Sequence, residues 1–214
     1  MSSAPAATML YLTYTPREDA ARDNYEDWLR EVDNPFFNSI PGIRQYTNWK
    51  AISPVPAAHT YRWFDHMVLD SADAVTEVLA NTDLQAFAAN WVRRWGRLPD
   101  EPDSDENYQM FLAQRTFLAE DGPRQPYLLI RVYETEAPGP AGAPLWDDAA
   151  LAPLMRGRRR ATWCLTDEIK GRLSLPVMDV AHLADPAEFD IVLRARPHLA
   201  ETAFVAERVA TPRD

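Results

Sequence analysis

The predicted strand over residues 61–69 carries the histidine that is best placed for proton transfer. Side chains alternate along a strand, so one face holds Arg62, Phe64, His66 and Val68 and the other holds Tyr61, Trp63, Asp65 and Met67. Both faces are partly apolar, so we expect a sheet buried on both sides, with His66 in a cavity or in the core. An imidazole has a pKa near neutrality and suits general acid/base catalysis. His66 is therefore the first candidate catalytic residue, and the alternative is a core histidine with satisfied hydrogen bonds. Asp65 points away from it and is expected to make a structural hydrogen bond.

The preceding predicted strand, residues 44–52, offers a cation and a phenol. Arg44, Tyr46 and Asn48 share one of its faces. If this strand pairs with the next one in register, that face is shared with His66. Arginine beside tyrosine can hold a carboxylate or an enolate, although an exposed arginine at a sheet edge is the alternative. Tyr11, in the first predicted strand, is a further candidate acid or oxyanion donor.

The chain is rich in aromatic residues, with seven Trp, eight Tyr and eight Phe. Trp and Tyr combine an apolar ring with one polar atom, which suits a cavity that must orient a substrate, although many of these rings could simply be core. The candidate substrate-binding residues are Asn48, Trp49, Trp63, Phe64 and Trp91. His59, in the proline-containing loop before residue 61, is a second candidate base, and an ordinary exposed histidine is the alternative.

Several classes of function are disfavoured by composition. Seven glycines, none separated by a single residue, leave no glycine-rich phosphate loop, and the G-x-S-x-G nucleophile motif is also missing. Cys164 is the only cysteine and no histidine pair has H-E-x-x-H spacing, so neither a metal site nor a cofactor is predicted. A formal charge of −10 disfavours nucleic acid and membrane surfaces as partners. A reducing, cytoplasmic setting fits the single cysteine.

The predicted elements follow one order twice. Residues 8–118 contain strands near 9–14, 44–52, 61–69 and 107–117, with helices over 19–37 and from Ser71 to Gly96. The first helix has the apolar stripe Tyr25, Trp28, Leu29 and Val32. A polar linker over 119–125 precedes a second set over 126–210, with shorter helices. We predict an α+β protein of two tandem ferredoxin-like βαββαβ units that form a pseudo-twofold α/β barrel, with Asp65 and Asp179 at matching positions.

Four short segments carry a family resemblance. They are Met9-Leu-Tyr-Leu-Thr-Tyr14, Tyr25-Glu-Asp-Trp-Leu29, Ile40-Pro-Gly-Ile-Arg-Gln-Tyr46 and Phe64-Asp-His-Met-Val-Leu69. Together they resemble the dimeric α/β-barrel superfamily, and within it the EthD-like proteins. The resemblance implies two four-stranded sheets facing each other with helices outside. Two chains usually supply those sheets, so a homodimer stays open, although one duplicated chain could supply both.

The superfamily includes monooxygenases, cyclases, isomerases and haem-degrading enzymes, so its fold does not decide function. Our first hypothesis is a cofactor-independent enzyme that abstracts a proton from a small aromatic or polyketide-like molecule, with decarboxylation, elimination, isomerisation or cyclisation as the outcome. A cofactor-free or haem-dependent oxygenase is the second hypothesis. The third is a small-molecule-binding accessory protein without catalysis.

Overall fold

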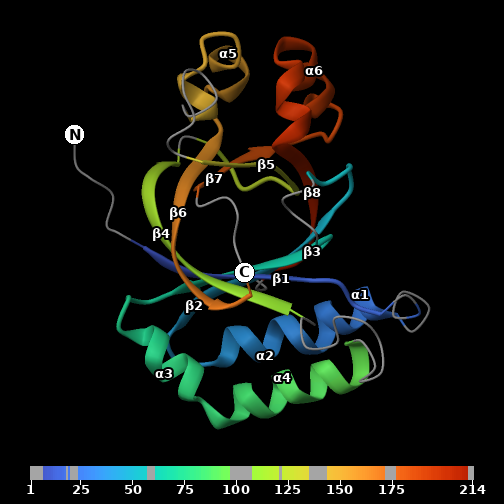
Figure 1. Ribbon diagram of the computed structural model, residues 1–214, viewed down its shortest axis with the longest axis vertical. Helices are drawn as coiled ribbons and strands as arrows, with labels where there is room; N and C mark the ends of the chain where they lie inside the picture. The colour runs from blue at the N-terminus through green and yellow to red at the C-terminus, as the bar shows by residue number, and fades with distance from the viewer. Residues whose placement is uncertain are drawn as a thin grey trace.

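The fold is known from a computed structural model, described here for residues 7–17, 19, 24–56, 61–96, 108–120, 122–134, 144–171 and 177–211. The strands of this part close into one antiparallel barrel in the order β1-β3-β2-β8-β5-β7-β6-β4 (Figure 1). Their bounds are β1 Thr8–Tyr14, β2 Ile43–Ala51, β3 Trp63–Leu69, β4 Tyr108–Glu120, β5 Tyr127–Tyr133, β6 Arg159–Lys170, β7 Val177–Leu183 and β8 Ala203–Ala210. The predicted α+β class is confirmed.

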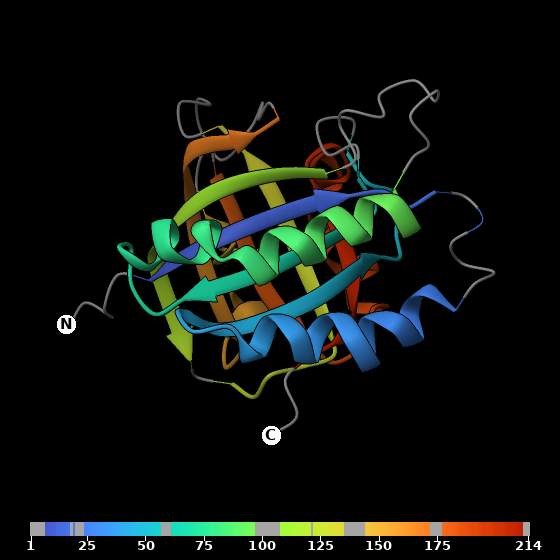
Figure 2. The ribbon, with the colours of Figure 1, turned by 90° about the horizontal axis from the view of Figure 1, so that it is seen from below.

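Helices cover two opposite sides of the barrel (Figure 1). On one side lie α1 Tyr25–Trp28, η2 Leu29–Asp33, α2 Asn34–Ser39, α3 Ala74–Ala80 and α4 Thr82–Trp95. On the other lie η5 Leu145–Asp147, α5 Ala152–Met155, α6 Glu188–Ala195 and η6 Pro197–Glu201. Seen from below, α4 and the α1–α2 helix lie across β1, β3 and β2 (Figure 2). Within the described ranges, no helix is long and apolar enough to cross a bilayer.

The two halves of the barrel have the same internal strand order. The first half reads β4-β1-β3-β2 and the second reads β8-β5-β7-β6, and the halves join where β2 pairs with β8 and β4 pairs with β6. Strand β4 extends through Glu120, two residues into the predicted linker. The division at 8–118 and 126–210 stays a prediction, because a closed barrel by itself does not mark where one unit ends.

The first helix contains an irregularity that changes its buried face. Residues Leu29–Asp33 form a π-helical turn just before Pro35. In a regular α-helix the proline ring would clash with the carbonyl four residues earlier, and the wider π-helical turn makes room for it. The extra residue in this turn also shifts the buried face of the helix by one position. The predicted stripe is therefore wrong at its end: Val32 is 43% exposed, whereas Asp33 is 3% exposed and faces the sheet.

Candidate functional site

Two cavities lie on opposite faces of the sheet that contains β1, β2 and β3. The outer cavity, of about 420 Å³, lies between this sheet and helices α2, α3 and α4, and the inner cavity, of about 450 Å³, lies inside one end of the barrel. Because side chains alternate, neighbouring residues of one strand reach different cavities. On β3, Asp65 lines the outer cavity and His66 lines the inner cavity.

A pair of buried carboxyl groups forms the polar wall of the outer cavity. Asp65 and Asp33 are 2% and 3% exposed. Asn48 bridges them, since its Nδ2 donates to Asp65 Oδ1 and to Asp33 Oδ2, both at 2.9 Å. Asp65 also accepts hydrogen bonds from the hydroxyls of Tyr46 (2.6 Å) and Tyr14 (3.1 Å). These donors are neutral, and in the described chain no cation is hydrogen-bonded to either carboxyl.

Burial makes both carboxyls weaker acids. Desolvation, only partly offset by hydrogen bonding, chiefly from Asn48, raises the pKa of Asp33 to about 7. Desolvation and the nearby charge of Asp33 hold the pKa of Asp65 well above its usual range. Two carboxylates cannot both ionise cheaply in such a place, so the pair titrates as a unit and holds one proton between its members over a range of pH. A general acid or base needs a pKa near the working pH, and the pKa of Asp33, near 7, meets this condition at neutral pH.

A chain of aromatic donors supports Asp65 from the helix side. Trp91 Nε1 donates to the Tyr25 hydroxyl at 3.0 Å, and the hydroxyls of Tyr25 and Tyr14 share a hydrogen bond. Tyr14 in turn donates to Asp65 at 3.1 Å. Helix α4, which carries Trp91, begins at Asn81, whose side chain accepts from Leu84 N at 3.0 Å. The chain therefore links the position of α4 to the carboxyl pair.

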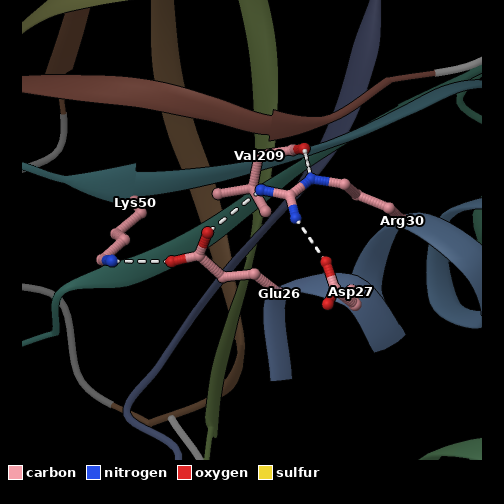
Figure 3. Close-up of polar contacts among 5 residues, drawn as sticks. All are labelled: Glu26, Asp27, Arg30, Lys50 and Val209. Atoms are coloured by element: carbon pink, nitrogen blue, oxygen red, sulfur yellow. Dashed lines mark hydrogen bonds and ion pairs between the residues drawn. The ribbon is translucent and has the colours of Figure 1, made fainter. Parts of the chain in front are cut away.

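The helix that carries Asp33 is fastened to the barrel by a charged network (Figure 3). Arg30 Nε donates to the carbonyl of Val209 on β8 at 3.1 Å, and the same guanidinium pairs with Glu26 and Asp27. Lys50 on β2 reaches Glu26 at 2.7 Å. The network ties α1 and the π-helical turn to strands from both halves of the barrel, which fixes the approach of Asp33 to Asn48.

The rest of the outer cavity is largely apolar. Its walls include Leu10, Leu12, Phe37, Met67, Leu84, Phe87, Val92 and Met110. Gln85 and Ala89, both exposed, and the half-buried Tyr108 and Lys170 also line it, so these residues mark the solvent side of the cavity. The Lys170 ammonium lies 3.9 Å from the centroid of the Tyr108 ring. A small apolar molecule with one polar or acidic position suits this arrangement.

The inner cavity has the opposite character. Its described lining contains His66, His182 and six arginines, and Glu120 is the only acidic residue among these described positions. Burial lowers the pKa of His66 to about 3, with the charge of His182 as a second cause. An imidazole with so low a pKa is neutral near pH 7 but is a weak base there. As a general base, His66 is therefore less well matched to neutral pH than the carboxyl pair.

The predicted catalytic residues do not form one group. The prediction that Tyr46 and Asn48 share a sheet face with His66 is wrong. Thr47 is the residue that pairs with His66. The side chains of Tyr46 and Asn48, on either side of Thr47, point to the outer face and contact Asp65. Arg44 does line the inner cavity with His66, because a bulge between Ile43 and Gln45 shifts the register there. His59 lies outside the described residues.

The aromatic candidates divide in the same way. Trp49 lines the inner cavity and Trp91 the outer cavity. Tyr11 and Phe64 are 2% and 0% exposed and pack in the barrel core, with Tyr11 5.7 Å from the His66 ring. Trp63 packs edge-on against Tyr25, 5.2 Å away, beneath the first helix.

The sequence reasoning missed Asp33. The apolar stripe of the predicted helix placed Val32 on the buried face. The signal that could have indicated Asp33 was the spacing of four residues from Leu29 to Asp33 and on to Phe37, together with Pro35.

Asp179, which matches Asp65 in the second half, is 0% exposed and accepts from Thr162 Oγ1 (2.8 Å) and Leu145 N (3.0 Å). Neither cavity includes Asp179 in its lining, whereas Asp65 lines the outer cavity. The predicted role of a structural hydrogen bond therefore fits Asp179 better than it fits Asp65. Among the described side chains, no group of three or more His, Cys, Asp or Glu is arranged to hold a metal ion.

Comparisons with known proteins agree on the fold. The family model of the REDY-like protein HapK matches residues 8–100, less than half of the chain. A crystal structure of an anthrone oxidase-like protein superposes with a TM-score of 0.60 at 10% identity, covering 98% of this chain and 93% of that one. A candidate monooxygenase from Lactobacillus acidophilus NCFM gives 0.51 at 11% identity, covering 96% and 95%. No curated protein matches the sequence. These comparisons show the barrel fold of the chain. The resemblance to the dimeric α/β-barrel superfamily, and within it to EthD-like proteins, stays a prediction.

Proposed function

We propose that this protein is a cofactor-independent enzyme that abstracts a proton from a small aromatic or polyketide-like molecule bound in the outer cavity. The observation that carries the proposal is the pair Asp65 and Asp33, buried at the wall of an apolar cavity, where burial raises the pKa of Asp33 to about 7 and holds the pKa of Asp65 well above its usual range. The pair takes the place of His66 as the catalytic base.

The proton moves from an acidic C–H or O–H of the substrate to the ionised member of the pair. The substrate is left as an enolate or phenolate, whose negative charge replaces that of the carboxylate. Tyr14 and Tyr46 donate to Asp65 in the resting state, and burial raises the pKa of both phenols, so they stay protonated as donors. As the pair takes up the proton and loses its charge, these hydroxyls become available to the new oxyanion. Decarboxylation, elimination, isomerisation or cyclisation can follow from that anion.

An oxygenase is the second candidate, and it shares the first step. An anthrone has an acidic CH₂ group, and its anion can be oxidised by dioxygen: anthrone plus O₂ gives anthraquinone plus water, so carbon is oxidised and oxygen reduced. The support is the similarity in fold to the anthrone oxidase-like protein, which concerns fold alone. For a haem-dependent version, the described lining of the outer cavity offers neither histidine nor cysteine, the common axial ligands. A protein that binds without catalysis is the remaining alternative.

The test is hydrogen–deuterium exchange at the acidic CH₂ of anthrone in anaerobic D₂O, followed by NMR. We expect the protein to accelerate exchange and Asp65→Asn to abolish the acceleration. Asp179→Asn is the matched control, since it neutralises the corresponding carboxyl of the second half and should retain exchange. Admitting oxygen separates the candidates, because oxygen uptake supports the oxygenase and exchange alone supports the first proposal. Binding without exchange or uptake across a panel of enolisable aromatic ketones and phenols would contradict both.

Three finer points belong to the same proposal. The identical strand order of the two halves supports a tandem ferredoxin-like origin for residues 8–118 and 126–210. We also propose kinship with EthD-like proteins, on the four segments quoted above. One chain already closes the barrel, so a homodimer, if formed, would join two complete barrels rather than complete a sheet.

A further inference from the structure

We propose that the inner cavity is a second binding site, separate from the outer cavity, which takes an organic anion with a carboxylate or phosphate group on a flat apolar body. Nothing in the proposed reaction uses this cavity. It lies on the opposite face of β2 and β3, and the two linings have no residue in common.

The charge of the lining is the first argument. The chain as a whole has 32 acidic and 22 basic residues, yet among the described residues that line this cavity there are six arginines and one acid, Glu120. Arg159 is paired with Glu120, and Arg44 lies 3.4 Å from Asp70 at the surface. Arg208 has no acidic or other side-chain partner in the part of the chain that the structure describes. Positive charge gathered in a cleft concentrates anions there.

A buried donor without a partner is the second argument. Trp49 is 3% exposed and lines the cavity, and its Nε1–H has no hydrogen-bond acceptor among the described residues. The indole N–H can only donate, so it needs an acceptor such as an anionic oxygen. His66 Nε2, on the neighbouring strand, is buried and unpartnered as well, and the two rings lie 6.0 Å apart. Leaving buried polar groups unpaired is costly, and a bound anion would satisfy them.

The shape and apolar surface of the cavity define the rest of the ligand. Trp49, Trp163, Leu128 and Val180 form apolar walls within a volume of about 450 Å³. Such a volume lies in the range of small-molecule sites. Arg115 lies over the Trp163 ring at 5.7 Å, which places a cation beside the apolar wall. A flat ring can therefore pack on the indoles while its acidic group meets the guanidinium groups.

Calorimetric titration with three probes tests the ligand class. The probes are 2-naphthoate, 2-naphthyl phosphate and the neutral 2-naphthalenemethanol. We expect at least one of the two anions to bind at least about tenfold more tightly than the alcohol, with an affinity that falls as salt is added. The tighter anion identifies the preferred head group. Equal binding of the alcohol, or binding of inorganic phosphate as tight as that of naphthyl phosphate, would overturn the proposal.

Variants locate the site. Arg208→Gln should weaken anion binding about tenfold or more, as expected for a lost charged hydrogen bond. Trp49→Phe keeps an aromatic ring, removes the N–H and should weaken binding severalfold. Arg194→Gln, on the exposed face of α6, makes the same charge change away from both cavities and is the control. If Arg208→Gln fails to fold, Arg44→Gln at the exposed edge replaces it. Equal affinity in the Arg208 and Arg194 variants, or loss of binding in Asp65→Asn instead, would overturn the proposal.

Discussion

The outer and inner cavities share their strands but differ in chemistry. Asp65 and His66 are adjacent residues of β3. Asp65 is buried beside a second carboxyl, and His66 is half-buried among arginines. Burial penalises the charged form of either group, so it raises the pKa of the carboxyl and lowers the pKa of the imidazole. The same physical effect therefore moves the pKa of an aspartate closer to the value that a base needs at neutral pH, and it moves the pKa of the histidine away from that value.

The comparison corrects the usual preference for histidine as the proton carrier. A histidine on a strand suggests catalysis because its ordinary pKa lies near 7, but that argument assumes a solvated ring. In this barrel the carboxyl pair is desolvated and supported by neutral donors, while the imidazole has cations nearby. We therefore propose proton transfer at the outer face of the sheet and anion binding at its inner face.

The largest predicted effect comes from Asp65→Asn. The amide cannot accept the proton, so the catalysed exchange rate should fall about 10²-fold or more, as expected for a lost general base. His66→Gln should change that rate less than tenfold. Rates of both variants, measured at a temperature where melting curves show them folded, test the assignment. A hundredfold loss in His66→Gln with little loss in Asp65→Asn would move the base to the inner cavity.

Tyr46→Phe should have an intermediate effect. It removes the 2.6 Å hydrogen bond to Asp65, which stabilises the carboxylate, so the apparent pKa of the rate profile should move upward and the rate at pH 7 should fall about tenfold. The pH profile is the informative measurement, because a purely structural loss would lower the rate without moving the pKa. Tyr133→Phe, on β5 beside Asp179, is the matched control and should leave the profile in place.

The third prediction concerns stability. The folded pKa of Asp33 lies above that of an unfolded aspartate, so between about pH 4 and 7 the folded chain holds the extra proton, and the free energy of unfolding falls as pH rises through this window. The buried imidazoles of His66 and His182 act in the opposite direction, because their pKa values are lowered. Asp33→Asn removes only the first contribution.

Melting curves at pH 5 and pH 8 isolate that contribution. Relative to wild type, Asp33→Asn should gain several degrees more at pH 8 than at pH 5, on the order of 5 °C. The same difference for Asp27→Asn, an exposed aspartate in the same helix, is the control and should be close to zero. An equal shift of Asp33→Asn at both pH values would mean that Asp33 ionises normally.

The smallest effect is expected from Arg30→Gln. Its ion pairs with Glu26 and Asp27 are half-exposed and contribute little, and the remaining loss is the hydrogen bond to the Val209 carbonyl. Chemical denaturation should show a loss of about 1 kcal/mol. A loss several times larger would mean that this network, rather than packing, holds the helix that carries Asp33.

Much of the fold could be predicted from the sequence. Short apolar runs with alternating side chains indicate the strands, and the spacing of apolar residues indicates the helices. The opposite directions of Asp65 and His66 also follow from alternation alone. The register of β2 could not be predicted, because the bulge near Arg44 is a backbone feature that gives no hydrophobic signal. The carboxyl pair was hidden for a similar reason: the π-helical turn moves Asp33, rather than Val32, onto the sheet.

The most direct test of the central claim is a ¹³C NMR titration of aspartate carboxyl groups between pH 4 and 9. The account predicts two carboxyl signals that titrate together, one with a midpoint near 7 for Asp33 and one well above the usual aspartate range for Asp65. It also predicts that Asp65→Asn removes one of them and lowers the midpoint of the other, because its charged neighbour is gone. Asp179→Asn should leave both in place. Burial raises the pKa of Asp179 to about 6, so its signal is identified first by its loss in Asp179→Asn. If every other aspartate that titrates does so near pH 4, or if both late signals persist unchanged in Asp65→Asn, the carboxyl pair is not the base and the proposed reaction is wrong.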